Sequence, residues 1–226
     1  MNVRILPANL QGEVFAPPSK SVAHRALICA ALANESSTVF PVDRSKDMEA
    51  TIGALKTLGA SIVRNDNGVT ITGIGKAPKQ AKVDCIESGS TLRFLIPIAA
   101  AKGISCQFIG SGRLPERPLA PYVDAFERKG AHLVGKFVPS HLSGQLQPGA
   151  FILPGNISSQ FITGLLFALP LLSKDSTITL STPLESAPYV DLTIHVLREF
   201  GVHICWEKDK FTIPGNQKYL ARKFQV

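Results

Sequence analysis

The chain repeats itself three times, and this repeat constrains its fold more than any other feature of the sequence. Three segments, ALKTLGASIV, AFERKGAHLV and LREFGVHICW, each read as the end of an amphipathic helix, a glycine and then a strand. Their glycines, Gly59, Gly130 and Gly201, stand 71 residues apart. This spacing predicts a domain built from three similar units that pack against one another.

Each unit carries the same features upstream of its glycine. A Ser-rich turn precedes an apolar run in SKSVAHRALICAALA, SGSTLRFLIPIAAA and SSQFITGLLFALPLL. These runs are apolar nearly all round, which is typical of helices buried on several sides, whereas the helix before each glycine has one apolar stripe and should lie nearer solvent. Strand-like runs follow the first helix (SSTVFPV, ISCQFIG, STITLST) and close the units (VTITGIG, GQLQPG, FTIPG).

Composition limits the kinds of partner. A chain of 226 residues with 45% hydrophobic content can bury a core as one large domain or two small ones. Its formal net charge of +7 should attract anions. The basic residues are scattered and most phenylalanines sit inside apolar runs, so we expect no nucleic-acid partner.

Neither a metal site nor a membrane segment is expected. The four cysteines are far apart and show no CxxC or Cys/His ligand spacing, which favours reduced thiols in a cytoplasmic protein. The most apolar stretch, 161–172, is shorter than the ~20 residues that a helix needs to cross a bilayer. The segment MNVRILPANLQGEV lacks the pattern of a signal peptide.

The three Ser-rich turns predict an anion site. In a pseudo-threefold arrangement they would meet at one end of the domain, where helix starts present free N–H groups and the positive ends of helix dipoles. Cations stand close to these turns: Lys20, Arg25, Arg93, Arg113 and Arg117. Hydroxyl and amide groups come from Ser19, Ser21, Ser88, Ser90, Ser158, Ser159 and Gln160.

Structural roles are the alternative for these residues. The serines could simply cap their helices. Arg117 could pair with Glu116, and Arg25 could cover apolar surface with its stem. Lys20 is harder to explain in this way, because it follows two prolines directly before a helix and has few neighbours to pair with.

Five motifs together resemble a known family. The segments PPSKSVAHRAL, SGSTLRFL, RLPERPL, GNISSQFITGLL and LESAPYVDLT resemble, in the correct order, motifs of the 5-enolpyruvylshikimate-3-phosphate synthases. The resemblance implies an enolpyruvyl transferase-like domain of the α/β (α+β) class, made of three repeated βαβαββ units with buried parallel helices and outer sheets. It also implies transfer of the enolpyruvyl group of phosphoenolpyruvate to shikimate 3-phosphate in aromatic amino-acid biosynthesis, without a cofactor or a metal.

The resemblance also assigns roles to residues. It implies that phosphoenolpyruvate is bound by Lys20, which is also catalytic, by Arg117 and Gln160, and near its phosphate by Gly89. It implies that shikimate 3-phosphate is bound by Ser21, Arg25, Ser158, Ser159, Ser186 and Tyr189. One departure puts a contact in doubt: the second turn reads ESGST where many relatives carry Asn-Ala-Gly-Thr, so Glu87 replaces an amide.

The resemblance further implies a division of the chain. Family members are about twice as long and consist of two domains with three units each. Residues 1–14 are therefore expected to be the first strands of an incomplete first domain, 15–215 the three-repeat substrate-binding domain, and 216–226 the crossover back to the missing first domain. The family's acid and base carboxylates lie in the other half. We expect this chain to bind shikimate 3-phosphate weakly and to be inactive without its partner, the C-terminal half.

Two other functions stay open. The related UDP-N-acetylglucosamine enolpyruvyl transferases share the architecture, but they normally carry a cysteine in the loop equivalent to GSGRLPERPL, where this chain has none. The chain could also be a non-catalytic anion-binding module.

Overall fold

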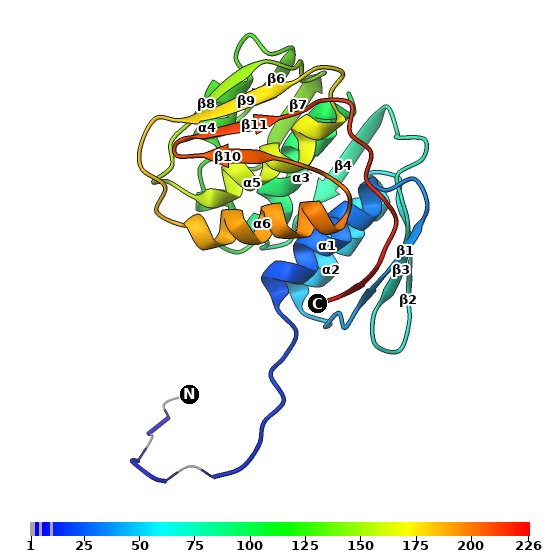
Figure 1. The fold of residues 1–226 in the computed structure, drawn as a ribbon, viewed down its shortest axis with the longest axis vertical. Helices are drawn as coiled ribbons and strands as arrows, with labels where there is room; N and C mark the ends of the chain where they lie inside the picture. The colour runs from blue at the N-terminus through cyan, green and yellow to red at the C-terminus, as the bar shows by residue number, and fades with distance from the viewer. Residues whose placement is uncertain (1–2, 5, 10) are drawn as a thin grey trace.

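Three sheets surround a group of buried helices in the computed structural model, which describes residues 3–4, 6–9 and 11–226 (Figure 1). The first unit contains α1 (Lys20–Leu32), β1 (Ser36–Phe40), α2 (Lys46–Thr57), β2 (Ser61–Arg64) and β3 (Val69–Thr72). The second contains β4 (Gln80–Asp84), α3 (Gly89–Ala101), β5 (Ser105–Ile109), the 3-10 turn η1 (Leu114–Glu116), α4 (Ala120–Phe126), β6 (Ala131–Val134) and β7 (Ser140–Gly144). The third contains β8 (Ala150–Leu153), α5 (Ser159–Ala168), the 3-10 turn η2 (Leu169–Leu171), β9 (Ser176–Leu180), α6 (Ala187–Glu199), β10 (Cys205–Glu207) and β11 (Lys210–Ile213).

The three sheets share one strand order. They run β12-β1-β3-β2, β4-β5-β7-β6 and β8-β9-β11-β10, where β12 is Lys223–Gln225. In each sheet the first pair is parallel and the other pairs are antiparallel. The predicted α/β class and the three repeated βαβαββ units are therefore confirmed.

The glycines at the repeat spacing adopt the same left-handed backbone conformation. Their φ angles are 108° at Gly59, 76° at Gly130 and 81° at Gly201. A side chain at such an angle is strained, so glycine is the natural residue to end each second helix.

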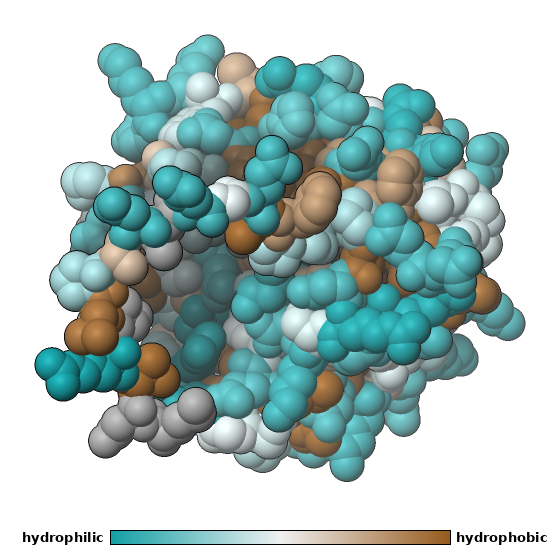
Figure 2. Space-filling model, turned by 90° about the horizontal axis from the view of Figure 1, so that it is seen from below, coloured by the Kyte–Doolittle hydropathy of each residue, from teal (hydrophilic) through white to brown (hydrophobic). Residues whose placement is uncertain are grey.

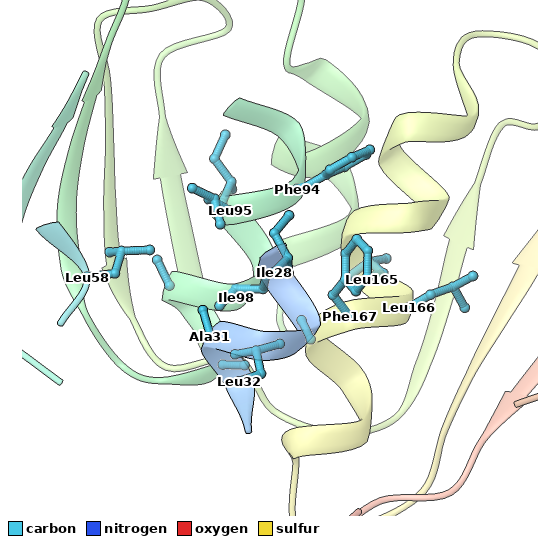
Figure 3. Close-up of a cluster of buried hydrophobic side chains, with 14 of the residues drawn as sticks. Ile28, Ala31, Leu32, Leu58, Phe94, Leu95, Ile98, Leu165, Leu166 and Phe167 are labelled. Atoms are coloured by element: carbon cyan, nitrogen blue, oxygen red, sulfur yellow. The ribbon is translucent and has the colours of Figure 1, made fainter. Parts of the chain in front are cut away.

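The first helices of the units, α1, α3 and α5, form the centre of the core. Figure 3 shows Ile28 and Leu32 of α1, Phe94, Leu95 and Ile98 of α3, and Leu165 and Phe167 of α5 gathered in one cluster. Burying one such side chain contributes about 1.5–3 kcal/mol. Their apolar sequences are explained by burial on several sides, as predicted.

The expected division of the chain into 1–14, 15–215 and 216–226 stays a prediction, and the structure describes only how the two end segments lie. No described residue in 1–14 belongs to a strand, and residues 1, 2, 5 and 10 of that predicted segment lie outside the described residues. The described part before α1 runs away from the rest of the molecule (Figure 1). In residues 216–226, the segment expected to cross over to another domain, Lys223 of β12 pairs with Thr38 of β1 in the first unit. The C-terminal segment thus supplies the parallel strand that β4 and β8 supply in the other sheets.

The closing strand of the second unit lies earlier in the chain than the sequence predicted. The run GQLQPG was expected to be a strand, but β7 ends at Gly144, whose φ is 77°. The following residues form a loop that leads into β8.

Among the described residues, no helix is long and apolar enough to span a membrane.

Candidate functional site

Each buried helix starts with a serine cap, and the three starts meet at one end of the molecule. The hydroxyl oxygens of Ser19, Ser88 and Ser158 accept backbone N–H groups in the first turns of α1, α3 and α5, at 3.3, 3.2 and 3.3 Å. Figure 2 views the molecule from the side where α1 begins and shows a hollow with hydrophilic residues in it.

A pocket of about 500 Å³ lies between these helix starts. All ten residues to which the family resemblance assigned a role line it: Lys20, Ser21, Arg25, Gly89, Arg117, Ser158, Ser159, Gln160, Ser186 and Tyr189. Six further residues complete the lining: Asp47, Glu87, Ser88, Ser90, Arg93 and Phe94. The structure therefore brings most groups of the predicted anion site together, but Ser19 and Arg113 are not among the residues that line the pocket.

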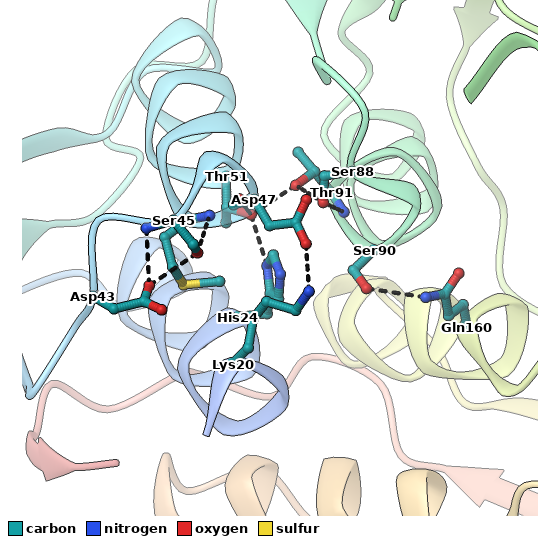
Figure 4. Close-up of polar contacts among 11 residues, drawn as sticks. Lys20, His24, Asp43, Ser45, Asp47, Thr51, Ser88, Ser90, Thr91 and Gln160 are labelled. Carbon is teal, nitrogen blue, oxygen red and sulfur yellow. Dashed lines mark hydrogen bonds and ion pairs between the residues drawn. The ribbon is translucent and has the colours of Figure 1, made fainter. Parts of the chain in front are cut away.

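Lys20 has a carboxylate partner that sequence reasoning missed. Its Nζ lies 2.6 Å from Oδ2 of Asp47 in the first turn of α2 (Figure 4). The repeat held a signal for this residue, because Asp47, Arg117 and Ser186 stand 70 and then 69 residues apart, each near the start of a second helix. The starts of the second helices line the pocket just as those of the first helices do.

Arg25 is almost completely buried and firmly held. Only 3% of it is exposed, and its Nε donates to Oγ1 of Thr193 at 2.8 Å. Its Nη1 donates to the carbonyl of Ser21 at 2.8 Å and its Nη2 to that of Tyr189 at 3.0 Å. Burial lowers the pKa of Arg25 to about 10, which still leaves it charged near neutral pH. The guanidinium carbon also lies 5.4 Å from the centre of the Phe94 ring, so the arginine covers apolar surface as well.

Arg93 orients Gln160. Nη1 of Arg93 donates to Oε1 of Gln160 at 2.9 Å, and Nε2 of Gln160 donates to the hydroxyl of Ser90 at 3.0 Å. The guanidinium of Arg93 lies 4.7 Å from the centre of the Phe161 ring, and burial lowers its pKa. Arg93 had been noted only as a cation near the second turn, and these contacts give it a place in the pocket wall.

Gly89 lets Arg117 approach the start of α3. A Cβ at Gly89 would lie 2.5 Å from Nη1 of Arg117. The suggested pair between Arg117 and Glu116 is not what forms, because Glu116 lies 3.7 Å from Arg113. Arg117 is exposed at the pocket rim and its guanidinium remains available to an anion.

Glu87, whose role as a ligand contact was in doubt, lies against the loop that carries Arg117. Its Oε1 accepts the backbone N–H of Arg113 at 3.1 Å. A Cβ at Gly112 would lie 2.5 Å from its Cδ, so the carboxylate sits close to the loop backbone. The carboxylate is therefore partly satisfied by the backbone of this loop.

The serines can cap helices and still bind an anion. A hydroxyl has one hydrogen and two lone pairs, so an oxygen that accepts a backbone N–H can still donate its own hydrogen. This applies to Ser158, whose oxygen accepts from Gln160 N. Ser186 makes no side-chain cap bond, and Tyr189 is 52% exposed at the rim.

The pocket suits a ligand with several negative charges. Four cations line it, Lys20, Arg25, Arg93 and Arg117, against two carboxylates. Arginine forks and free helix N–H groups match the geometry of phosphate and carboxylate groups. Within the part of the chain that the structure describes, no group of three or more His, Cys, Asp or Glu side chains could hold a metal ion.

Comparison with known proteins decides the family. The family model for EPSP synthase (3-phosphoshikimate 1-carboxyvinyltransferase) matches residues 6–226. The chain belongs to the EPSP synthase family. Its predicted family is thus confirmed.

Relatives in the EPSP synthase family are similar over nearly the whole chain. The 3-phosphoshikimate 1-carboxyvinyltransferase of Clostridium kluyveri is 49% identical over 222 residues, which are 96% of this chain and 52% of that protein. The one from Clostridium acetobutylicum is 45% identical over 99% of this chain and 54% of its own length. The solved EPSP synthase from Acinetobacter baumannii superposes with a TM-score of 0.82 at 26% identity, over 95% of this chain and 49% of that one. The chain therefore spans about half the length of the relatives it matches.

Proposed function

We propose that this chain forms the shikimate 3-phosphate-binding part of an enzyme that transfers the enolpyruvyl group of phosphoenolpyruvate to the 5-hydroxyl of shikimate 3-phosphate and releases phosphate. The observation that carries the proposal is the single pocket lined by all ten residues that the family motifs pointed to. Family membership and the net positive lining support it, because both substrates are anions with several charges.

The two substrates would divide the pocket between them. Shikimate 3-phosphate would contact Arg25 and the hydroxyls of Ser21, Ser158, Ser159, Ser186 and Tyr189. Phosphoenolpyruvate would lie between Lys20, Arg117 and Gln160, with its phosphate at the start of α3 near Gly89. Lys20 would act in catalysis by stabilising the negative charge of phosphoenolpyruvate as the hydroxyl adds to it and phosphate leaves.

The reaction needs an acid and a base besides the two carboxylates that line the pocket. Addition and elimination move protons, and this requires an acid and a base within hydrogen-bond reach of the substrate. The two carboxylates in the described lining are both engaged, Asp47 with Lys20 and Glu87 with the backbone of Arg113. We therefore propose that turnover needs a partner segment equivalent to the other half of the relatives.

The cytoplasmic location expected from the sequence stays a prediction.

Calorimetric titration of shikimate 3-phosphate into the chain tests the proposal. We expect measurable binding, and Arg25→Ala should weaken it at least tenfold, since a charged hydrogen bond contributes about 1.5–3 kcal/mol. Arg198→Ala is the matched control, because Arg198 is an exposed arginine of α6 outside the pocket. Unchanged affinity in Arg25→Ala would remove Arg25 from the site.

Phosphate release separates the enzyme from a binding module. The chain alone should release negligible phosphate from the two substrates. Activity should appear on mixing with the separately expressed C-terminal half of the Clostridium kluyveri relative. Steady turnover by the chain alone would contradict the need for a partner, whereas binding without activity in the mixture would favour the anion-binding module.

A further inference from the structure

One buried hydroxyl recurs at the same repeat position in every unit. Thr51 of α2, Tyr122 of α4 and Thr193 of α6 stand 71 residues apart, the spacing of the helix-ending glycines. All three are completely buried. A buried hydroxyl without a partner costs free energy, so each must be satisfied by the helices around it.

Each of these hydroxyls bonds to groups on two first helices. Thr51 lies 2.7 Å from His24 Nδ1 of α1 and 2.7 Å from the hydroxyl of Thr91 of α3 (Figure 4). Tyr122 donates toward backbone carbonyls of α3 and α5, 2.7 Å from that of Arg93 and 3.0 Å from that of Phe161.

The hydroxyl of Thr193 differs from the other two in its bonding partners. Thr193 lies 3.0 Å from the hydroxyl of Thr163 in α5 and accepts Nε–H of Arg25 in α1 at 2.8 Å. Of the three hydroxyls, it alone bonds a cationic side chain that lines the pocket.

The guanidinium of Arg25 has two N–H groups left for a ligand. It carries five N–H donors in a fixed plane. One is used by Thr193, one on Nη1 by Ser21 and one on Nη2 by Tyr189. One N–H on each terminal nitrogen therefore remains unused by the described part of the chain, and N–H groups on the two terminal nitrogens of a guanidinium suit two oxygens of one phosphate or carboxylate.

We infer that Thr193 is a positioning residue that fixes the plane of the Arg25 guanidinium, so that its two unused N–H groups face an oxyanion of the substrate in the pocket. The Thr193 hydroxyl lies 2.7 Å from the Tyr189 carbonyl, to which it donates, and the same carbonyl accepts from Nη2 of Arg25. Threonine, carbonyl and guanidinium are thus joined to one another by hydrogen bonds. The inference rests on the proposed function and adds a residue to which the family motifs assigned no role.

Matched valine variants test this inference. Thr193→Val keeps the shape of the side chain and removes the acceptor of Nε–H. It should weaken shikimate 3-phosphate binding about tenfold, because a guanidinium that is no longer held in its plane loses about one charged hydrogen bond to the substrate. Thr193→Ser restores the hydroxyl and should bind within about threefold of the wild type. Thr51→Val is the control, because it removes the equally buried hydroxyl at the same repeat position and should change affinity less than about twofold.

A second readout needs no ligand. The Nε–H signal of Arg25, assigned in nitrogen-15 NMR spectra by its loss in Arg25→Lys, should exchange slowly with water in the wild type. Its exchange should be at least about tenfold faster in Thr193→Val, because the hydrogen bond that protects it is gone. Fast exchange in the wild type would overturn the inference even if the valine variant did not fold.

The two readouts separate this inference from the proposed function. If a folded Thr193→Val binds shikimate 3-phosphate like the wild type, Thr193 does not position Arg25 and the proposed function stands. If the wild type does not bind shikimate 3-phosphate, but Nε–H is protected and released by Thr193→Val, the substrate is wrong and the positioning role stands.

Discussion

Lys20 shows how single residues make this pocket ready for an anion. Its ammonium lies 2.6 Å from Asp47, but 55% of its side chain is exposed. Exposed ion pairs contribute little, about 0–1 kcal/mol, because water screens them. An incoming phosphate or carboxylate can therefore share the ammonium at small cost. Arg25 is the opposite case, because its buried charge is held in place before any ligand arrives.

His24 should make stability depend on pH. Burial lowers its pKa from 6.5 to about 4, with Lys20 and Arg25 acting in the same direction and Asp47 and Asp43 against it. The unfolded chain then binds a proton more readily than the folded one. Stability is full above pH 6.5 and is lost as the pH falls towards 4.

Urea unfolding at two pH values checks this linkage. Between pH 7 and pH 5, His24 should remove about 2 kcal/mol of unfolding free energy. His24→Asn should lose less over this interval by about that amount, and the carboxylates contribute equally to both proteins. The other four histidines, His132, His141, His195 and His203, are exposed. Equal losses in the two proteins would show that His24 is not buried in its neutral form.

At the scale of elements, the close approach of α3 and α5 depends on one glycine. A Cβ at Gly164 of α5 would collide with the hydroxyl of Tyr122 and the carbonyl of Arg93. The repeated hydroxyl of α4 therefore fits only because α5 has no side chain there.

Two alanine variants measure this packing. Gly164→Ala should destabilise the protein by about 1–3 kcal/mol, as overpacking of a core does. Gly53→Ala should stabilise it by up to about 1 kcal/mol, because Gly53 is an exposed helical glycine of α2 with nothing near its Cβ position. The measurement is the midpoint of urea unfolding. Similar values for both variants would mean that α3 and α5 can move apart freely.

The repeat made most of the elements and the pocket predictable. A helix start needs a capping serine and a helix end of this kind needs glycine, so local chemistry marks both in the sequence. Asp47 was missed because its partner Lys20 is 27 residues away and no local rule links them. Thr193 was missed although Thr51 and Tyr122 stand at the same spacing. A threonine or a tyrosine inside a helix gives no local signal of the hydrogen bonds that it makes to other helices.

At the scale of the whole molecule, strand β12 closes the threefold arrangement. It pairs with β1, and the Arg222 N–H that precedes it donates to the hydroxyl of Ser37, 185 residues earlier, at 3.1 Å. The hydroxyl of Tyr219 in the same segment donates to the carbonyl of Phe167 at 2.8 Å inside the core. Such pairing depends on contacts at the largest sequence separations, which spacing within a repeat does not reveal.

The closed arrangement points all the first helices at one pocket. Their free N–H groups, together with Lys20 and Arg25, surround one pocket. If one molecule of shikimate 3-phosphate contacts all three units, the signals of the three units must report the same dissociation constant.

The most direct measurement is a titration of the chain with shikimate 3-phosphate, followed by the backbone amide signals of Ser21, Ser90 and Ser159. These residues lie in the first turns of α1, α3 and α5. We predict that all three signals shift along one saturation curve with one dissociation constant. Shifts at a single helix start, or three different dissociation constants, would contradict a shared site.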